Sequence, residues 1–172
     1  MNALRFAMIT TFYPPYNFGG DGMGILRLSQ ALVRRGHHVT VIHDADAYVS
    51  LAGREPGAGP ADDGVEIVTL RSPLGRFSNL LTQQTGRPIV HGERIREVMD
   101  AGRFDVTVFH NISLVGGPGV LQYGRGTVLY MAHEHWLVPL LAVLDADGRV
   151  AATGPRLLFP DGTLQHAGVI LV

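Results

Sequence analysis

The chain alternates short, continuous apolar runs with longer segments in which apolar residues recur every three or four positions. Such runs are typical of buried strands, and the longer segments are typical of helices that cover a sheet. On this pattern we predict strands over residues 4–10, 38–43, 65–70, 105–109 and 127–132, and helices over residues 23–35, 77–84 and 88–101.

Residues 4–43 contain the clearest unit, which is a strand, a glycine-rich loop, a helix that ends at Gly36, and a second strand. This order is a β-α-β crossover, which implies parallel pairing with a right-handed connection. The alternation continues to about residue 132 and predicts an α/β fold, a Rossmann-like parallel sheet with helices on both faces. Residues 44–63 are rich in Gly, Ala, Pro and Asp, so we predict a surface excursion there.

The pattern changes after Trp136, where the alternation of strands and helices stops. We predict a helix over 137–145 and short strands over 150–172, around the turn at 160–162. The predicted organisation is therefore one domain over residues 1–136, followed by a short α+β fragment over 137–172 that is not an independent domain.

The composition excludes several classes of protein. The 172 residues carry a net charge of −1, so the chain lacks the basic field that nucleic-acid binding needs. The absence of cysteine excludes disulfides and thiolate metal sites. Residues 137–144 form the longest strongly apolar stretch, which is too short to span a bilayer. We therefore expect a cytoplasmic protein with no nucleic-acid partner, and peripheral association with a membrane stays open.

The loop after the first predicted strand carries glycines at positions 19, 20, 22 and 24. Glycines just before a helix N-terminus allow close approach of a ligand, and the free N–H groups there favour a phosphate or diphosphate. A flexible surface loop is the alternative interpretation. The dinucleotide fingerprint fails because Ile25 stands where its third glycine should be, which argues against a dehydrogenase, and no Walker loop is present.

Histidines follow two of the later predicted strands. His110 follows the fourth strand, and His133 and His135 follow the fifth. One of them could serve as an acid, a base or a hydrogen-bond donor to a sugar or phosphate. A zinc site from the same three residues and a purely structural role are the alternatives.

Other polar residues near the strand ends have weaker signals. Asp44 and Asp46 follow the second strand and could hold a ribose, and His43 could line a cleft. His37, His38 and His91 are predicted to be surface or helix-flanking residues.

Several motifs resemble the N-terminal domain of family 4 glycosyltransferases, which have the two-domain GT-B fold. Residues 12–20 read Phe-Tyr-Pro-Pro-Tyr-Asn-Phe-Gly-Gly and precede the amphipathic helix, and residues 35–41 read Arg-Gly-His-His-Val-Thr-Val. Residues 104–111 resemble the family's fourth strand, and residues 131–136 resemble the segment after its fifth. The similarity extends over residues 4–138.

The resemblance implies transfer of a sugar from a nucleotide-sugar donor to a glycan, lipid or small-molecule acceptor, without a metal or other cofactor. It implies that His133 is the catalytic residue near the transferred sugar, and that Gly19 and Gly20 face the donor diphosphate. The remaining residues that it places in donor or substrate binding are Asp21, His110, Asn111 and Glu134.

The last part of the chain departs from that family. No counterpart of the C-terminal domain that binds the nucleotide is present, and residues 155–169 instead resemble an internal stretch of family 2 glycosyltransferases, which have the GT-A fold. We therefore hypothesise a chain that joins parts of two glycosyltransferases, as a deletion between neighbouring genes would produce, and that is inactive alone. The alternatives are a shortened divergent family 4 member, a non-catalytic phosphate- or nucleotide-binding module, and a chain without function.

Overall fold

The computed structural model describes residues 2–131, 157–158 and 164–166. The chain divides into two units, Met1–Met131 and Ala132–Val172, which we describe separately. In the second unit, β6 (Leu157–Leu158) and β7 (Leu164–His166) form an antiparallel pair, as predicted for short strands on either side of residues 160–162. The helix predicted over 137–145 lies outside the described residues.

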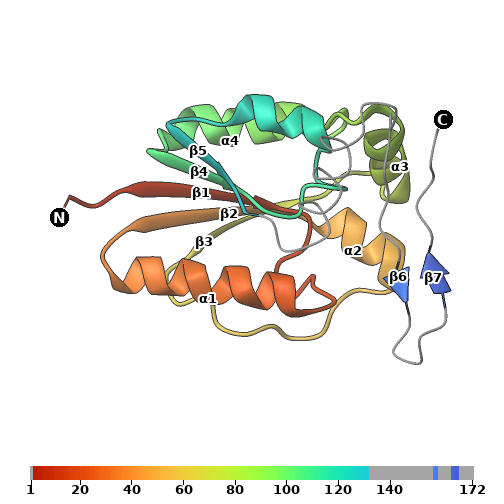
Figure 1. Ribbon diagram of the computed structural model, residues 1–172, viewed down its shortest axis with the longest axis horizontal. Coiled ribbons are helices and arrows are strands. Elements are labelled where there is room, and N and C mark those ends of the chain that lie inside the picture. Colours follow the sequence, from red (N-terminus) through yellow and green to blue (C-terminus); the bar gives the residue numbers. More distant parts are fainter. Residues whose placement is uncertain (1, 132–156, 159–163, 167–172) are drawn as a thin grey trace, which may run out of the picture. The chain divides into compact units, whose positions relative to one another are not determined.

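The first unit is built on a five-stranded parallel sheet in the order β3-β2-β1-β4-β5. This confirms the predicted α/β fold with a Rossmann-like sheet (Figure 1). The central strands are long apolar runs because helices bury both of their faces. The strands are β1 (Arg5–Thr10), β2 (His38–Asp44), β3 (Glu66–Leu70), β4 (Val106–Phe109) and β5 (Thr127–Tyr130).

Helices cover the two faces of this sheet. Figure 1 shows α1 on one face, α4 and the 3₁₀ helix η1 on the other, and α2 and α3 toward the carboxyl ends of the strands. The bounds are α1 (Gly20–Arg34), α2 (Ala45–Ala52), α3 (Arg76–Thr85), α4 (Gly92–Gly102) and η1 (Pro118–Tyr123).

Two apolar cores result, one on each face of the sheet. Alternate β1 side chains point to opposite faces. Ala7 and Ile9 therefore join the core that includes Ile95 of α4, whereas Met8 joins the core that includes Ile25 of α1. Among the described residues, no helix has both the length and the apolar character needed to cross a bilayer.

Two predicted helix starts were wrong, and one helix was not predicted. Helix α1 begins at Gly20 rather than at residue 23, and the low helix propensity of glycine had concealed that start. Helix α4 begins at Gly92 rather than at residue 88. The segment between β4 and β5, for which we predicted no helix, contains η1, whose buried Val120 and Tyr123 join the core.

The predicted surface excursion over 44–63 was wrong for its first part. Residues 45–52 form α2, with Asp44 fully buried and Asp46 only 6 % exposed. The Asp44 side chain accepts a hydrogen bond from the backbone N–H of Ala47, so it caps the helix. Two aspartates in a row of small residues are typical of a solvated loop, but here they begin a buried helix.

Candidate functional site

The first candidate site lies where the order of the strands reverses, between β1 and β4. Crossovers leave this point in opposite directions, and ligands of such folds bind beyond the carboxyl ends of the strands there. The loops after the two strands are joined, because Thr11 N donates to the carbonyl of Asn111 at 2.6 Å. The buried Thr11 hydroxyl also accepts from Leu114 N at 3.1 Å and from Val115 N at 3.3 Å.

Gly19 and Gly20 lie on the exposed rim of this edge, at the N-terminus of α1. Gly19 is the N-cap residue and has no side chain that could cap the helix. A Cβ atom added at Gly19 or Gly20 would meet nothing within 4 Å, whereas one at Gly22 would lie 2.5 Å from Asn17 Oδ1. Backbone N–H groups of the first turn are therefore open to a ligand.

Asp21 lies in the first turn of α1 and is half-buried. A carboxylate there is favourable for the helix dipole. It also places a negative charge beside any phosphate at the same end, so the site suits a ligand that offers hydroxyl groups near its anion.

Aromatic side chains hold the loop before α1 in place. The exposed Phe18 ring stacks on Tyr48 of α2, with centroids 4.7 Å apart. Tyr16 packs edge-on against the same Tyr48 at 5.8 Å and also contacts His43 at 5.4 Å. The loop is thus fastened to α2, at the end of the neighbouring strand β2.

The predicted residues after β4 have different environments. His110 is 1 % exposed, and its Nε2 atom lies 3.5 Å from the Met8 sulfur, inside the core. Asn111 is half-buried, and its Oδ1 atom accepts from the backbone and hydroxyl of Ser113. The structure therefore brings Asn111, but not the ring of His110, toward the surface of this edge.

The predicted catalytic residue His133 and its neighbours Glu134 and His135 lie outside the described residues. Their roles, and those of Gly19, Gly20, Asp21, His110 and Asn111, stay predictions.

His43, which we expected to line a cleft, is 1 % exposed instead. Its Nε2 atom lies 2.9 Å from the hydroxyl of Thr69 on the adjacent strand β3. Burial lowers the pKa of His43 to about 4, so the ring is neutral at neutral pH.

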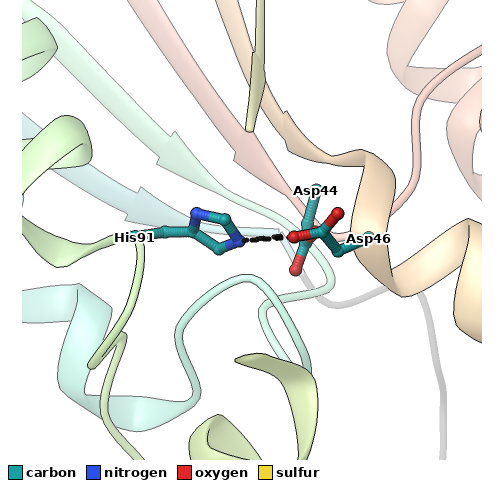
Figure 2. Close-up of side chains that lie close together, drawn as sticks. All are labelled: Asp44, Asp46 and His91. Atoms are coloured by element: carbon teal, nitrogen blue, oxygen red, sulfur yellow. Dashed lines mark ion pairs between the residues drawn. The ribbon is translucent and has the colours of Figure 1, made fainter. Parts of the chain in front are cut away.

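A second candidate site consists of Asp44, Asp46 and His91, and sequence reasoning did not assemble it. Asp44 ends β2, Asp46 lies in the first turn of α2, and His91 is the N-cap residue of α4. Figure 2 shows the imidazole directed at the carboxylates, with His91 Nε2 3.4 Å from Asp46 Oδ2 and 3.8 Å from Asp44 Oδ1. Of the two alternatives predicted for His91, a surface or a helix-flanking position, the structure shows the second, and the residue is buried, with 5 % of it exposed.

Neighbouring polar groups hold the two carboxylates in place. Asn79 of α3 donates its side-chain N–H to Asp44 Oδ2 at 2.7 Å. Ser72 donates both its backbone N–H and its hydroxyl to Asp46 Oδ2, at 2.8 and 2.9 Å. The hydroxyl of Ser78 lies 3.3 Å from His91 Nε2.

Burial dominates the electrostatics of this group. It raises the pKa of Asp44 to about 7, an effect that neighbouring Asp46 reinforces and hydrogen bonds from Ala47 and Asn79 oppose. Burial also lowers the pKa of His91, against the attraction of Asp46. In both groups, burial disfavours the charged form, which is the carboxylate of Asp44 and the imidazolium of His91.

A cavity of about 320 Å³ adjoins this second site at Asp46. Its lining residues are Asp46, Val49, Ser50, Gly53, Gly75 and Arg76. The only sequence signal for the site was the Asp-x-Asp pattern directly after a buried strand, and nothing in the sequence connected it with His91, which lies on a distant helix.

The fold defines a Rossmann-like α/β protein. No protein-family model matches the chain. It is 28 % identical over 78 residues to the uncharacterized protein y4gI of Sinorhizobium fredii, and the match covers 45 % of this chain and 8 % of that protein.

Among solved structures, the chain is similar to the glycotransferase of kitacinnamycin, with a TM-score of 0.48 and 17 % identity. The match covers 85 % of this chain and 36 % of the glycotransferase. The chain thus spans well under half the length of both similar proteins.

Proposed function

We propose that the chain supplies the acceptor-side domain of a sugar-transferring enzyme, in which Gly19 and Gly20 face the diphosphate of a nucleotide-sugar donor. The observation that carries the proposal is the open, glycine-lined N-terminus of α1, at the carboxyl end of β1 and next to the point where the strand order reverses. Such an edge is where Rossmann-like folds hold phosphates.

The resemblance of residues 12–20 and 35–41 to family 4 glycosyltransferases supports the choice of a sugar transferase. In this proposal, as the resemblance implies, His133 is the catalytic residue near the transferred sugar, and Asn111 and Glu134 take part in donor or substrate binding. Asp21 accepts a hydrogen bond from a donor hydroxyl, which suits a carboxylate beside a phosphate.

The proposal assigns to residues 1–172 only one wall of the donor site. In the resembled family a separate domain binds the nucleotide, and transfer depends on positioning the donor against the acceptor. We therefore expect the chain to bind nucleotide sugars weakly and to show no turnover by itself.

The first experiment tests the loop. The full chain is titrated with common nucleotide sugars by ligand-observed NMR, next to Gly20→Ala and Gly24→Ala. Both glycines have open space around them, so both variants should fold, but only the methyl group at position 20 lies at the proposed diphosphate. We expect Gly20→Ala to weaken binding about tenfold, which corresponds to ~1.4 kcal/mol. Equal affinities in both variants would contradict the proposal.

A non-catalytic phosphate- or nucleotide-binding module is the second candidate, because the same open helix terminus supports it. A comparison of two ligands separates the candidates. If His133 is near the transferred sugar, His133→Ala should weaken binding of the nucleotide sugar and leave binding of the nucleoside diphosphate unchanged. Equal effects on both ligands would favour the binding module.

A further inference from the structure

The buried group of Asp44, Asp46 and His91 has no part in the function proposed above. Its three side chains come from β2, α2 and α4, yet their ligand atoms all lie within 4.8 Å of one another. All three residues are buried. A convergence of two carboxylates and one imidazole needs a physical explanation, because burying like charges together is costly.

We propose that Asp44, Asp46 and His91 bind a divalent cation, with Zn²⁺ the best match to their chemistry. One imidazole nitrogen and two carboxylate oxygens are ordinary zinc ligands. Tetrahedral ligands about 2.0–2.1 Å from zinc are about 3.3 Å apart. The distances from His91 Nε2 to the carboxylate oxygens, 3.4 and 3.8 Å, are close to that separation.

The surroundings of the carboxylates resemble the outer shell of a metal site. Metal-binding carboxylates are usually hydrogen-bonded by neighbouring groups that fix their orientation. Asn79 has this position toward Asp44, and Ser72 has it toward Asp46. The two supporting residues come from outside the helices that carry the proposed ligands, so the site is fixed by tertiary packing.

The charge balance also favours a cation. Within the described part of the chain, arginines pair with Glu55, Glu97 and Asp100 but with neither Asp44 nor Asp46. A divalent ion between the two carboxylates would neutralise both of them. Buried carboxylates without such compensation are strongly unfavourable.

A cavity lies next to the proposed site. The cavity of about 320 Å³ has Asp46 in its wall, together with Ser50 and Arg76. Three protein ligands leave a fourth tetrahedral position for water or for another ligand. The cavity therefore borders the proposed site at Asp46, the proposed ligand that lines it.

The test uses the full chain after treatment with a chelator, titrated with Zn²⁺, Mn²⁺ or Mg²⁺ by calorimetry. We expect one equivalent of Zn²⁺ to bind, and we expect Asp46→Asn and His91→Gln to weaken binding at least tenfold. His38→Gln is the matched control, because His38 is exposed. His135→Gln tests the competing zinc site that the sequence suggested for His110, His133 and His135.

Several results would overturn the proposal. They are absence of saturable binding, equal affinity in His91→Gln and His38→Gln, or loss of binding in His135→Gln alone. If the variants fail to fold, side-chain NMR of the wild-type chain tests whether Zn²⁺ binds at His91. Zn²⁺ should then shift the His91 Nε2 resonance, and an unchanged resonance contradicts the site. Neither outcome depends on nucleotide-sugar binding, so this test and that of the proposed function fail separately.

Discussion

At the scale of single residues, glycines at turns differ in what a side chain would meet. Gly36 and Gly126 both have positive φ, +85° and +63°. Space around Gly36 is open, whereas a Cβ at Gly126 would collide with the backbone carbonyl of Asp105, at the start of β4. The strain of a left-handed conformation is therefore common to both positions, and the collision occurs only at one.

We predict that Gly36→Ala costs about 1 kcal/mol of unfolding free energy, from backbone strain alone. Gly126→Ala should cost at least about 3 kcal/mol, because the β4–β5 connection must shift as well. Urea denaturation of both variants measures the difference. Equal losses would show that the connection before β5 adapts without cost.

His43 provides a pH test at the same scale. Its folded-state pKa of about 4 lies below the ordinary value of 6.5, so the unfolded chain binds more protons between these pH values. The contribution of this group to stability is therefore lost as pH falls from 6.5 toward 4.

We expect His43→Gln, which can still hydrogen-bond Thr69, to remove roughly 3 kcal/mol of this acid sensitivity, at about 1.4 kcal/mol per pKa unit. Denaturant unfolding of both proteins at pH 4, 5, 6 and 7 measures the unfolding free energy of each. The difference between wild type and variant at each pH removes the contribution of all other titrating groups. Parallel curves for the two proteins would contradict the assignment.

At the scale of elements, the β1 and β4 loops depend on one hydroxyl group. Thr11 Oγ1 accepts two backbone N–H groups, from Leu114 and Val115, and all three residues are buried. Replacing Thr11 with the isosteric Val leaves both N–H groups without this acceptor.

We predict that Thr11→Val lowers the unfolding free energy by about 2–3 kcal/mol. Thr11→Ser should cost less, because it keeps the hydroxyl. Hydrogen exchange at Leu114 and Val115 should accelerate in Thr11→Val and change little in Thr11→Ser. Unchanged exchange in both variants would mean that the backbone finds other acceptors.

At the scale of the first unit, strand position determines local stability. β1 pairs with both β2 and β4 and has four buried residues in a row, whereas β5 pairs with β4 and all four of its residues are exposed. Amides whose opening breaks more pairing and more packing exchange more slowly.

We therefore predict that β1 amides exchange slowest and β5 amides fastest among the five strands. Native-state hydrogen exchange read by NMR gives the ranking directly. Val128 and Leu129 of β5 are exposed in the structure. Equal protection of β5 and β1 amides from exchange would contradict this prediction and would show that another part of the protein covers β5 in solution.

Much of the fold could be predicted because its signals are local. The apolar runs marked the five strands to within a few residues, since buried parallel strands need continuous apolar sequence. Helix α1 was recognised from its repeating Leu and Ala positions, but its first turn was not, because consecutive glycines are a loop signal. The helix over residues 45–52 was missed because its short segment of Ala and Asp shows no apolar repeat in the sequence. Only the tertiary structure shows that its first turn is buried.

The candidate sites also differ in how far local sequence patterns predict them. Gly19 and Gly20 were predicted because a glycine-rich loop before a helix is a contiguous pattern, and the structure adds that both positions are open. The ring of His110 lies against Met8, which no local pattern could indicate. His91 was predicted to be a surface or helix-flanking residue, because nothing in its neighbours along the chain indicates contact with two aspartates of another crossover.

The sequence by itself determined the alternation of strands and helices, the glycine-rich turn and the absence of thiol chemistry, since each depends on residue type and spacing. Tertiary structure alone decided which strand ends meet, because the order β3-β2-β1-β4-β5 arises from crossovers that pack on opposite faces. It also decided that Asp44, Asp46 and His91 share one buried space. Burial and the convergence of side chains are properties of packing, and packing joins residues that the chain keeps far apart.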